Sequence, residues 1–285
     1  MRKRLRKTFA ETDTSRDCFR MYNAFDIIGD LAIIKMPSHP EASASEVARG
    51  VMTRHKNIKS VFVQTTEVHG DFRLRGLTHV GGENRTSTLH KESGCLFRVD
   101  VAKCYFSPRL SGERIRIANF VEESETVVNM FAGVGCFSIA IAKRANNVKV
   151  YSIDINPAAI EFMIENIRLN GVYARVIPIL GDARTVISDR LQCCANRVLM
   201  PLPDKALEYL PAAVSALKQE GGWIHPHMFV HTIKTENPCE IVRQKLSETF
   251  NRLDIEYEIA TTRVVRSTGP NWWQIAADIH ILGCE

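Results

Sequence analysis

The sequence lacks the features that mark membrane-spanning and secreted proteins. No apolar run approaches the roughly 20 residues that a membrane-spanning helix needs, and the N-terminal residues lack the apolar core of a signal peptide. The eight cysteines form no C-x-x-C pair and follow no regular spacing, which disfavours a disulfide framework. We therefore expect a soluble, cytoplasmic protein with reduced cysteines and no membrane contact.

The motifs of two hydrolase classes are also missing. The sequence contains neither the G-x-S-x-G turn of a serine hydrolase nor the H-E-x-x-H helix of a zinc protease. The segment IHPHMFVH would place His225 and His227 on one face of a strand, but no cysteine or carboxylate stands at a typical ligand offset. We expect these histidines in the core or in a cleft, and we expect no metal.

The chain is long enough for one full α/β domain and a smaller partner. It has 285 residues, of which 45% are hydrophobic, and its net charge of +5 favours polyanionic partners. Five of the first seven residues are Lys or Arg, which predicts a flexible basic arm over residues 1–19; a merely solvated tail is the alternative. We expect an α+β domain over residues 20–120 and a larger domain over residues 121–285.

The most informative segment is VVNMFAGVGCFSIAIAKRANNVKVYSIDINP, residues 127–157. A short apolar strand leads to a turn with Gly133 and Gly135, a helix follows, and a second strand ends at Asp154. Glycines let the backbone approach a ligand closely, and a carboxylate at this place can accept hydrogen bonds from both ribose hydroxyls of an adenosine. A dinucleotide loop has a third glycine where this chain has Ser138, so the pattern disfavours NAD and favours S-adenosylmethionine, which has no pyrophosphate.

Strand and helix signals alternate through the second half of the chain. Apolar strands near residues 127, 148, 176, 198 and 223 are separated by helical segments, which predicts a parallel sheet covered on both faces. Residues 257–265 and 273–282 predict a final antiparallel pair, and residues 109–120 a helix just before the glycine turn. The predicted fold class is α/β, with a Rossmann-like, doubly wound sheet and a smaller N-terminal α+β domain.

Two further segments follow predicted strands of the sheet. In GDAR, Asp182 could accept a hydrogen bond from an adenine amino group, or it could cap a helix. In RVLMPLP, Pro201 and Pro203 form a rigid strand end that could expose carbonyl groups to a target nitrogen, or simply end the strand.

The segment 88–116 combines basic and aromatic residues. Lys91, Arg109, Arg114 and Arg116 alternate with apolar strands and lie near Tyr105 in the sequence, a composition that suits phosphate contact and base stacking. A solvated charged face is the alternative. Glu113 is an isolated carboxylate among arginines, which would keep it ionised.

These segments resemble the archaeal and eukaryotic tRNA methyltransferases that methylate N1 of the guanosine at tRNA position 37. The resemblance runs over about residues 22–281 and rests on FDIIGDLAI, HKESGCLFRVDVAKCYFSPRLSGERIRIA, FAGVGCFSIAIAK, DINPAAIEFMIENIRLN and RVLMPLP. Of these, HKESG followed by YFSPRL and ER is the specific signature. The resemblance implies a class I methyltransferase fold, S-adenosyl-L-methionine as cofactor and the anticodon stem-loop of tRNA as partner.

The resemblance also implies roles for individual residues. Glu113 would be the general base that removes the N1 proton, Arg73 would steady guanine O6, and Pro201 would stand beside the base. A carboxylate and a cation facing the developing oxyanion are what this proton transfer requires. The implied cofactor residues are Tyr105, Phe131, Gly133, Gly135, Asp154, Ile155, Asp182, Ala183 and Pro203. The implied RNA-binding residues are Lys91, Arg109, Arg114, Arg116 and Arg266.

The sequence departs from the family pattern in three places. Pro201 stands where members carry an Asn that would hold the catalytic carboxylate, and Asn129 stands where Asp is common. Many members have an additional N-terminal domain that grips the tRNA body, whereas this chain begins almost directly at the second domain, so we expect recognition through the anticodon stem-loop and the basic arm, by a monomer. The alternatives are a wyosine-pathway tRNA enzyme, which methylates a wyosine precursor or transfers an aminocarboxypropyl group, and a noncatalytic RNA-binding relative.

Overall fold

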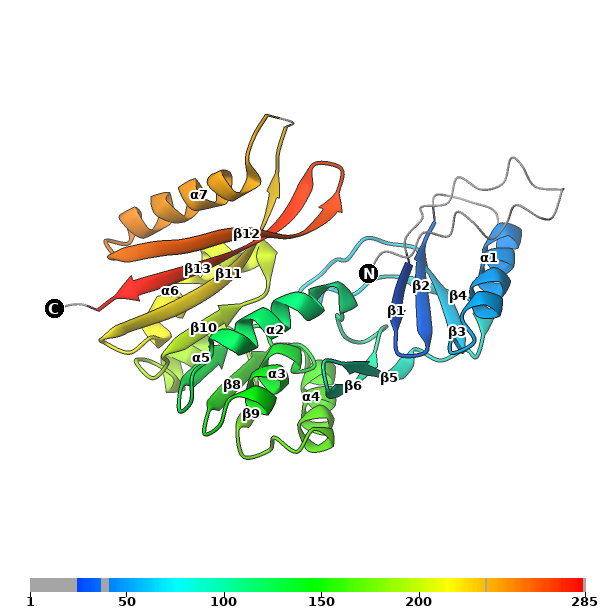
Figure 1. The fold of residues 1–285 in the computed structure, drawn as a ribbon, viewed down its shortest axis with the longest axis horizontal. Coiled ribbons are helices and arrows are strands. Elements are labelled where there is room, and N and C mark those ends of the chain that lie inside the picture. The colour runs from blue at the N-terminus through cyan, green and yellow to red at the C-terminus, as the bar shows by residue number, and fades with distance from the viewer. Residues whose placement is uncertain (1–24, 37–40, 234, 284–285) are drawn as a thin grey trace. The chain divides into compact units, whose positions relative to one another are not determined.

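The computed structural model describes residues 25–36, 41–233 and 235–283, and the chain divides into two compact units, Met1–Arg109 and Leu110–Glu285. Figure 1 shows the helices and strands of both units. The predicted basic arm, residues 1–19, lies outside the described residues. No helix in the described part of the chain is long and apolar enough to span a membrane.

The first unit is built on a four-stranded sheet with the order β1-β2-β3-β4. Its elements are β1 (Phe25–Ile28), β2 (Leu31–Lys35), α1 (Glu41–Arg54), β3 (Ser60–Gln64) and β4 (Leu77–Gly82), followed by a separate hairpin of β5 (Ser87–Glu92) and β6 (Cys95–Asp100). The turn between β1 and β2 needs Gly29, whose φ is 57° and where a Cβ would lie 2.1 Å from Thr88 Oγ1. The unit is α+β, as the sequence predicts.

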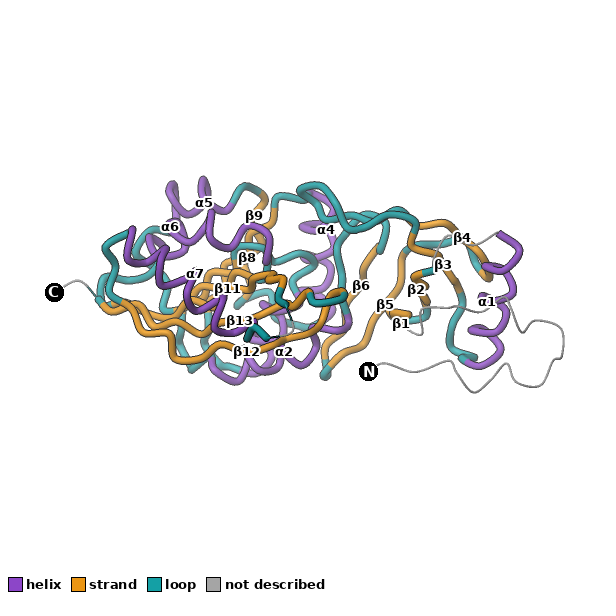
Figure 2. Tube along the Cα trace, turned by 90° about the horizontal axis from the view of Figure 1, so that it is seen from above, coloured by secondary structure: helices purple, strands orange, loops and turns teal. Residues whose placement is uncertain are grey.

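The second unit contains a seven-stranded sheet with the order β12-β13-β11-β10-β7-β8-β9. Its strands are β7 (Thr126–Asn129), β8 (Lys149–Asp154), β9 (Val176–Leu180), β10 (Arg197–Met200), β11 (Gly221–His231), β12 (Tyr257–Gly269) and β13 (Trp272–Leu282). Its helices are α2 (Ser111–Phe120), α3 (Cys136–Arg144), α4 (Pro157–Leu169), α5 (Ala183–Arg190), α6 (Ala206–Ala216) and α7 (Pro238–Arg252). Only β13 runs antiparallel to its neighbours, and Figure 2 shows helices on both faces of the sheet. The predicted doubly wound sheet with a final antiparallel pair is confirmed.

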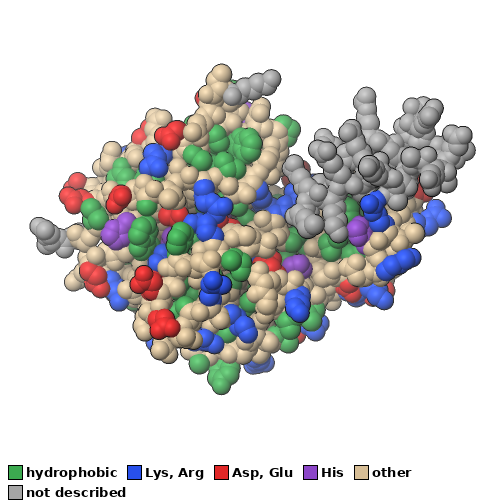
Figure 3. Space-filling model, in the orientation of Figure 1, with side chains coloured by type: hydrophobic (Ala, Val, Ile, Leu, Met, Phe, Trp, Pro, Cys, Tyr) green, Lys and Arg blue, Asp and Glu red, His purple; other side chains and the backbone are tan. Residues whose placement is uncertain are grey.

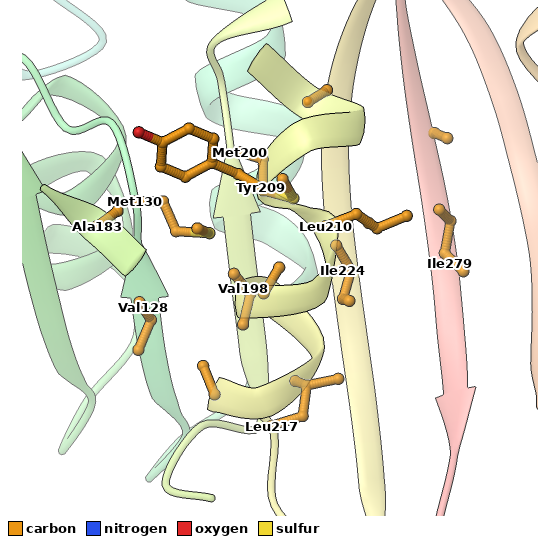
Figure 4. Close-up of a cluster of buried hydrophobic side chains, with 14 of the residues drawn as sticks. Val128, Met130, Ala183, Val198, Met200, Tyr209, Leu210, Leu217, Ile224 and Ile279 are labelled. Carbon is orange, nitrogen blue, oxygen red and sulfur yellow. The ribbon is translucent and has the colours of Figure 1, made fainter. Parts of the chain in front are cut away.

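The main core of the second unit lies between this sheet and α5, α6 and α7. Val128, Val198 and Ile224 come from adjacent strands, and Tyr209 and Leu210 come from α6 (Figure 4). These side chains are buried, and strands that are apolar on both faces are typical of a parallel sheet between two helical layers. Burial of this core fixes the strand ends from which the loops of the site project.

The two units divide eleven residues earlier than the boundary after residue 120 that the sequence predicts. Helix α2 packs on α3 and buries Ile117 and Ala118, so it belongs to the second unit. Its packing partner follows it in the chain, which is why the helical pattern alone does not show to which unit α2 belongs.

Candidate active site

The chain passes from β7 to α3 through the predicted glycine turn. Gly133 and Gly135 have φ values of 56° and 90°, which favour glycine, and a Cβ at Gly135 would lie 2.8 Å from Met163 Cγ. Strands β7 and β10 are neighbours, and the chain moves outward from them in opposite directions along the sheet. Ligands of doubly wound sheets bind at the carboxyl ends of the strands where the order reverses, and the glycine turn lies there.

Asp154, the last residue of β8, fastens this turn. Its Oδ2 accepts a hydrogen bond from the Gly133 N–H at 2.6 Å and its Oδ1 one from the Asn156 N–H at 2.9 Å. Burial raises the pKa of the Asp154 carboxyl, and these backbone hydrogen bonds oppose the shift. Asp154 therefore joins the ends of β7 and β8 into one wall of the candidate site.

Two large apolar side chains are exposed beside this wall. Ile155 follows β8 and is 44% exposed, and Leu180 ends β9 and is 53% exposed. Exposed apolar surface next to a carboxylate suits an adenosine, whose base is flat and apolar on its faces and whose ribose carries hydroxyl groups. The residues at this edge therefore fit the expected cofactor. Sequence reasoning missed Leu180, although its position directly before GDAR is a signal that could have identified it.

Ser138 occupies the position of the third glycine in a dinucleotide loop, and in the structure its side chain has a structural role that the sequence pattern does not show. Its hydroxyl accepts hydrogen bonds from Asn129 Nδ2 at 3.1 Å and from Ser152 Oγ at 2.7 Å. All three side chains are fully buried. Because buried polar groups are stabilised by such hydrogen bonds, Asn129 and Ser138 tie β7, α3 and β8 together beneath the glycine turn.

Asp182 adopts the helix-capping role that the sequence left open. It precedes α5, and its Oδ1 accepts hydrogen bonds from the backbone N–H groups of Arg184 and Thr185 at 2.9 and 3.4 Å. Its Oδ2 accepts one from the Tyr209 hydroxyl, and burial together with this bond raises the pKa of Tyr209 to about 12. Phe131 packs edge-on against the same Tyr209 ring, with centroids 5.1 Å apart. Asp182, Ala183 and Phe131 thus share one edge of the candidate site.

Glu113 lies in α2 with its side chain only 1% exposed. Arg116 donates two hydrogen bonds to it, from Nε at 3.0 Å and from Nη2 at 2.7 Å. Arg263 Nη1 donates a third to Oε2, and His227 Nε2 lies 3.5 Å from Oε1. Burial by itself raises the pKa of Glu113, but the hydrogen bonds from His227 and Arg116 outweigh it and lower the pKa to about 2. Glu113 is therefore ionised at neutral pH.

The position of His227 relates Glu113 to the carboxyl edge of the sheet. His227 follows Pro226, which pairs with Met200 at the end of β10, so it lies level with Pro201. Its ring also packs edge-on against Phe137 in α3, with centroids 6.0 Å apart. The ionised Glu113 and the glycine turn therefore flank the same edge of the second unit.

A chain of buried charged groups lies behind Arg116. Asp278 accepts hydrogen bonds from Arg116 Nη1 at 2.6 Å, from His225 Nδ1 at 2.6 Å and from Thr261 Oγ1 at 2.7 Å. Arg197 donates to His225 Nε2 at 2.7 Å, so the Nδ1 of His225 carries the proton that faces Asp278. Burial raises the pKa of Asp278, and the bonds from His225 and Arg116 bring it well below its usual range.

Sequence reasoning missed this chain of contacts. The predicted core or cleft position of His225 and His227 is confirmed, but their partners come from β10, β13 and α2. Asp278 is the one carboxylate in the mostly apolar strand β13, and this is the signal that could have identified it.

The predicted RNA-binding residues differ in their surroundings. Lys91 is exposed on β5 and, with Arg98, lines a hollow of about 610 Å³ in the first unit. Arg109 pairs with Asp26 at 2.7 Å, and Arg266 donates to Gln274 at 2.7 Å. Arg114 is only 4% exposed, and the guanidinium of Arg116 is shared by Glu113 and Asp278.

The remaining predicted residues lie in both units. The guanidinium of Arg73 lies over the Tyr105 ring in the first unit, 5.2 Å from its centroid. Pro201 follows β10 and Pro203 opens a short 3-10 turn, both half-buried. Figure 3 shows both basic and acidic side chains on the visible face of the second unit, so no single sign of charge covers it.

Comparisons with known proteins place this site in a family. The TRM5/TYW2 methyltransferase domain matches residues 88–256, and the TYW2 N-terminal domain matches residues 5–86. The chain is 40% identical, over 90% of its length and 74% of the relative's, to the tRNA (guanine(37)-N(1))-methyltransferase Trm5b of Pyrococcus abyssi. It is 34% identical, over 91% of its length and 94% of the relative's, to the tRNA 4-demethylwyosine(37)-methyltransferase Taw21 of Saccharolobus solfataricus.

Solved structures agree with this similarity. The complex of aTrm5 with tRNALeu matches with a TM-score of 0.79 and 38% identity, covering 92% of this chain and 72% of that one. The complex of Methanocaldococcus jannaschii TYW2 with AdoMet matches with a TM-score of 0.66 and 30% identity, covering 91% of this chain and all of that one. The predicted class I methyltransferase fold is therefore confirmed. The chain belongs to the TRM5/TYW2 methyltransferase family.

Proposed function

We propose that this protein transfers a methyl group from S-adenosylmethionine to N1 of the guanosine at position 37 of tRNA. The observation that carries the proposal is Glu113, a buried carboxylate that is ionised and stands at the same edge of the sheet as the glycine turn. Guanine N1 is protonated at neutral pH, so a methyltransferase that acts there needs a base beside its cofactor.

The cofactor is proposed to lie over the carboxyl ends of β7, β8 and β9. The Asp154 carboxylate would accept hydrogen bonds from the ribose hydroxyls, and the apolar side chains of Ile155 and Leu180 would contact the adenine ring. The other proposed contacts are Gly133, Gly135, Phe131, Asp182, Ala183 and Pro203. When bound, the cofactor supplies an electrophilic methyl group on its positive sulfonium. The protein's own task is to orient the acceptor nitrogen and remove its proton.

Glu113 would take the N1 proton onto one of its carboxylate oxygens. Its low pKa keeps it ionised but also makes it a weak base while all its donors stay in place, so a donor must leave as the proton arrives. Arg73 is proposed to face guanine O6, where negative charge develops as N1 is deprotonated. Pro201 cannot supply the side-chain hydrogen bond of the family Asn, and Arg116 and His227 take over the orientation of Glu113 in this proposal.

The RNA partner is proposed to be the anticodon stem-loop of tRNA, bound by a monomer. The structure of a relative of the same fold, aTrm5, has been solved in complex with tRNALeu, and Lys91 and Arg98 expose positive charge in the first unit. We propose the first unit for RNA and substrate recognition and the second for cofactor binding, with the basic arm and the exposed side of Arg109 as further phosphate contacts. Burial of Arg114 and the sharing of Arg116 between two carboxylates favour structural roles for these two residues, whereas Arg266, half-buried and bonded to the neutral Gln274, stays a proposed RNA contact.

Nucleoside mass spectrometry tests the proposal. Unmodified tRNA transcripts with G37 are incubated with the protein and S-adenosylmethionine, and a transcript with A37 serves as the matched control. We expect a gain of about 14 Da on guanosine 37, the mass of a transferred methyl group. A transcript whose G37 stays unmodified at saturating cofactor would contradict the proposal.

A wyosine-pathway reaction is the second candidate. Residues 5–86 match the TYW2 N-terminal domain, and the chain is 37% identical to the tRNA(Phe) (4-demethylwyosine(37)-C(7)) aminocarboxypropyltransferase of Methanocaldococcus jannaschii. The absence of the family Asn at Pro201 instead motivates the third alternative, a noncatalytic RNA-binding relative. tRNA that carries 4-demethylwyosine distinguishes the candidates, because aminocarboxypropyl transfer adds about 101 Da and methyl transfer about 14 Da. A noncatalytic RNA-binding relative would produce neither mass.

A further inference from the structure

Two arginines hold the Glu113 carboxylate, and they differ in how firmly they are held themselves. Arg116 is 18% exposed and donates to both Glu113 and Asp278, whereas Arg263 is 43% exposed. Among the described residues, Glu113 is the one carboxylate that pairs with Arg263. One guanidinium is therefore held from behind, and the other reaches the carboxylate from the solvent side.

The contacts behind Arg116 make its position costly to change. Asp278 accepts two hydrogen bonds from Arg116, and His225 and Arg197 continue the chain to Glu125, to which Arg197 donates twice at 2.8 Å. Breaking one member of a buried ion pair leaves an uncompensated charge in a poorly solvated place. Arg116 is thus expected to stay on Glu113 throughout the reaction.

Arg263 reaches Glu113 from the edge strand of the sheet. It pairs with Ala276, which on its other side pairs with His227, so Arg263, Ala276 and His227 form one row across β12, β13 and β11. The small side chain of Ala276 lets the longer side chains on both sides reach toward the same carboxylate. Register irregularities flank Arg263, between Ile259 and Thr261 and between Val264 and Arg266. Such bulges at sheet edges re-aim side chains and often lie next to active sites.

The hydrogen bonds on Glu113 show what the departure of Arg263 would change. Oε1 faces Arg116 and His227, and Oε2 faces Arg116 and Arg263. Without Arg263, Oε2 keeps one donor and regains an acceptor site on its solvent side. That is the side from which an N1–H group could donate.

We propose that Arg263 restrains Glu113, the proposed general base, and that binding of the RNA substrate releases this restraint. In the free enzyme its guanidinium holds Glu113. When tRNA binds, the guanidinium transfers to an acceptor oxygen of the RNA, a phosphate oxygen or guanine O6. Glu113 then keeps Arg116 and accepts the N1 proton on Oε2 as the N1–H bond breaks. This inference rests on the proposed tRNA substrate.

A double-mutant cycle on tRNA affinity tests the exchange. Glu113→Gln removes the charge that holds Arg263, so we expect tRNA to bind roughly 5-fold tighter or more, although turnover is lost. In the Arg263→Gln background the same Glu113→Gln change should no longer tighten binding. A structural role for either residue would not produce tighter binding that depends on the other. Equal effects of Glu113→Gln in both backgrounds would overturn the proposal.

Single variants of Arg263 identify which RNA oxygen accepts its guanidinium. They also keep the proposal testable if Glu113→Gln fails to fold, which a thermal melt would detect. If Arg263 moves to a phosphate, Arg263→Gln lowers the slope of log affinity against log salt by about 1. If it moves to guanine O6, the slope stays and the single-turnover rate at saturating tRNA falls. Arg263→Lys should partly restore whichever value changed. The control is Arg252→Gln, which removes one charge from the exposed side of α7 away from Glu113.

The possible failures can be told apart. If Arg263→Gln changes neither the salt slope nor the single-turnover rate, the release of Arg263 is wrong while the proposed function stands. If the wild-type protein neither binds nor modifies tRNA, the proposed function itself fails.

Discussion

Replacement of Asp278 by Asn tests whether the buried chain behind Arg116 holds the candidate active site together. The carboxylate is 6% exposed and accepts from Arg116, His225 and Thr261. An Asn at this position has one acceptor oxygen, and its amide N–H₂ would face one of these donors. The substitution keeps the volume and removes only the charge and half of the acceptors, so any effect comes from the hydrogen bonds.

The expected loss of stability follows from this geometry. Removing one partner from a buried ion pair costs about 3–5 kcal/mol. In a protein of this size about 1 kcal/mol lowers the melting temperature by about 2–4 °C, so we expect a decrease of roughly 10 °C. At a temperature where the variant is folded, kcat should also fall because Arg116 no longer holds Glu113 in place, while the affinity for the cofactor should stay unchanged.

The matched control is Asp189→Asn, the same chemical change at an exposed position of α5. Differential scanning calorimetry of both variants gives the comparison. Exposed substitutions of this kind are usually worth about 0.5 kcal/mol or less, so the control should melt within about 2 °C of the wild type. If Asp278→Asn melts as the control does, the buried chain does not stabilise the site and the reasoning fails.

Two further predictions follow from the same geometry. Asp154→Ala removes the carboxylate that is proposed to accept hydrogen bonds from the ribose and that accepts one from the Gly133 N–H. The dissociation constant of S-adenosylmethionine, measured by calorimetric titration, should therefore rise. An unchanged constant would count against the proposed pocket. The pKa of Glu113 is lowered in the folded protein to about 2 from an ordinary value of 4.5, so the stability that its ionisation contributes is fully present above about pH 4.5 and is lost as the pH falls toward 2. Urea unfolding of the wild type and of Glu113→Gln should therefore give free energies that converge over this pH range; a difference that is independent of pH would refute the shift.

The sequence predicts the fold well because the signals of the fold are local. Apolar periodicity lies within single elements and the glycines after β7 lie within one turn, and the structure confirms the predicted doubly wound sheet. The unit boundary differs because it depends on the packing of α2 against a helix later in the chain.

The candidate site could be predicted only in part, for a physical reason. The glycine turn and Asp154 lie in one segment, so their spacing carries the signal. Arg116 and Asp278 are 162 residues apart in the chain, and neither position has a local pattern that names its partner. For the same reason the sequence predicts RNA contacts for arginines that the structure pairs with carboxylates. A count of charged residues shows that the chain carries many Lys and Arg side chains, but only the fold decides which of these side chains are paired with a carboxylate.

The most direct test of the account is single-turnover methyl transfer to G37 of tRNA by the wild type and by Glu113→Ala. If Glu113 is the base, the variant should bind S-adenosylmethionine as the wild type does and transfer the methyl group about 10²-fold more slowly or worse. A variant that folds, binds the cofactor and forms 1-methylguanosine at the wild-type rate would contradict the account.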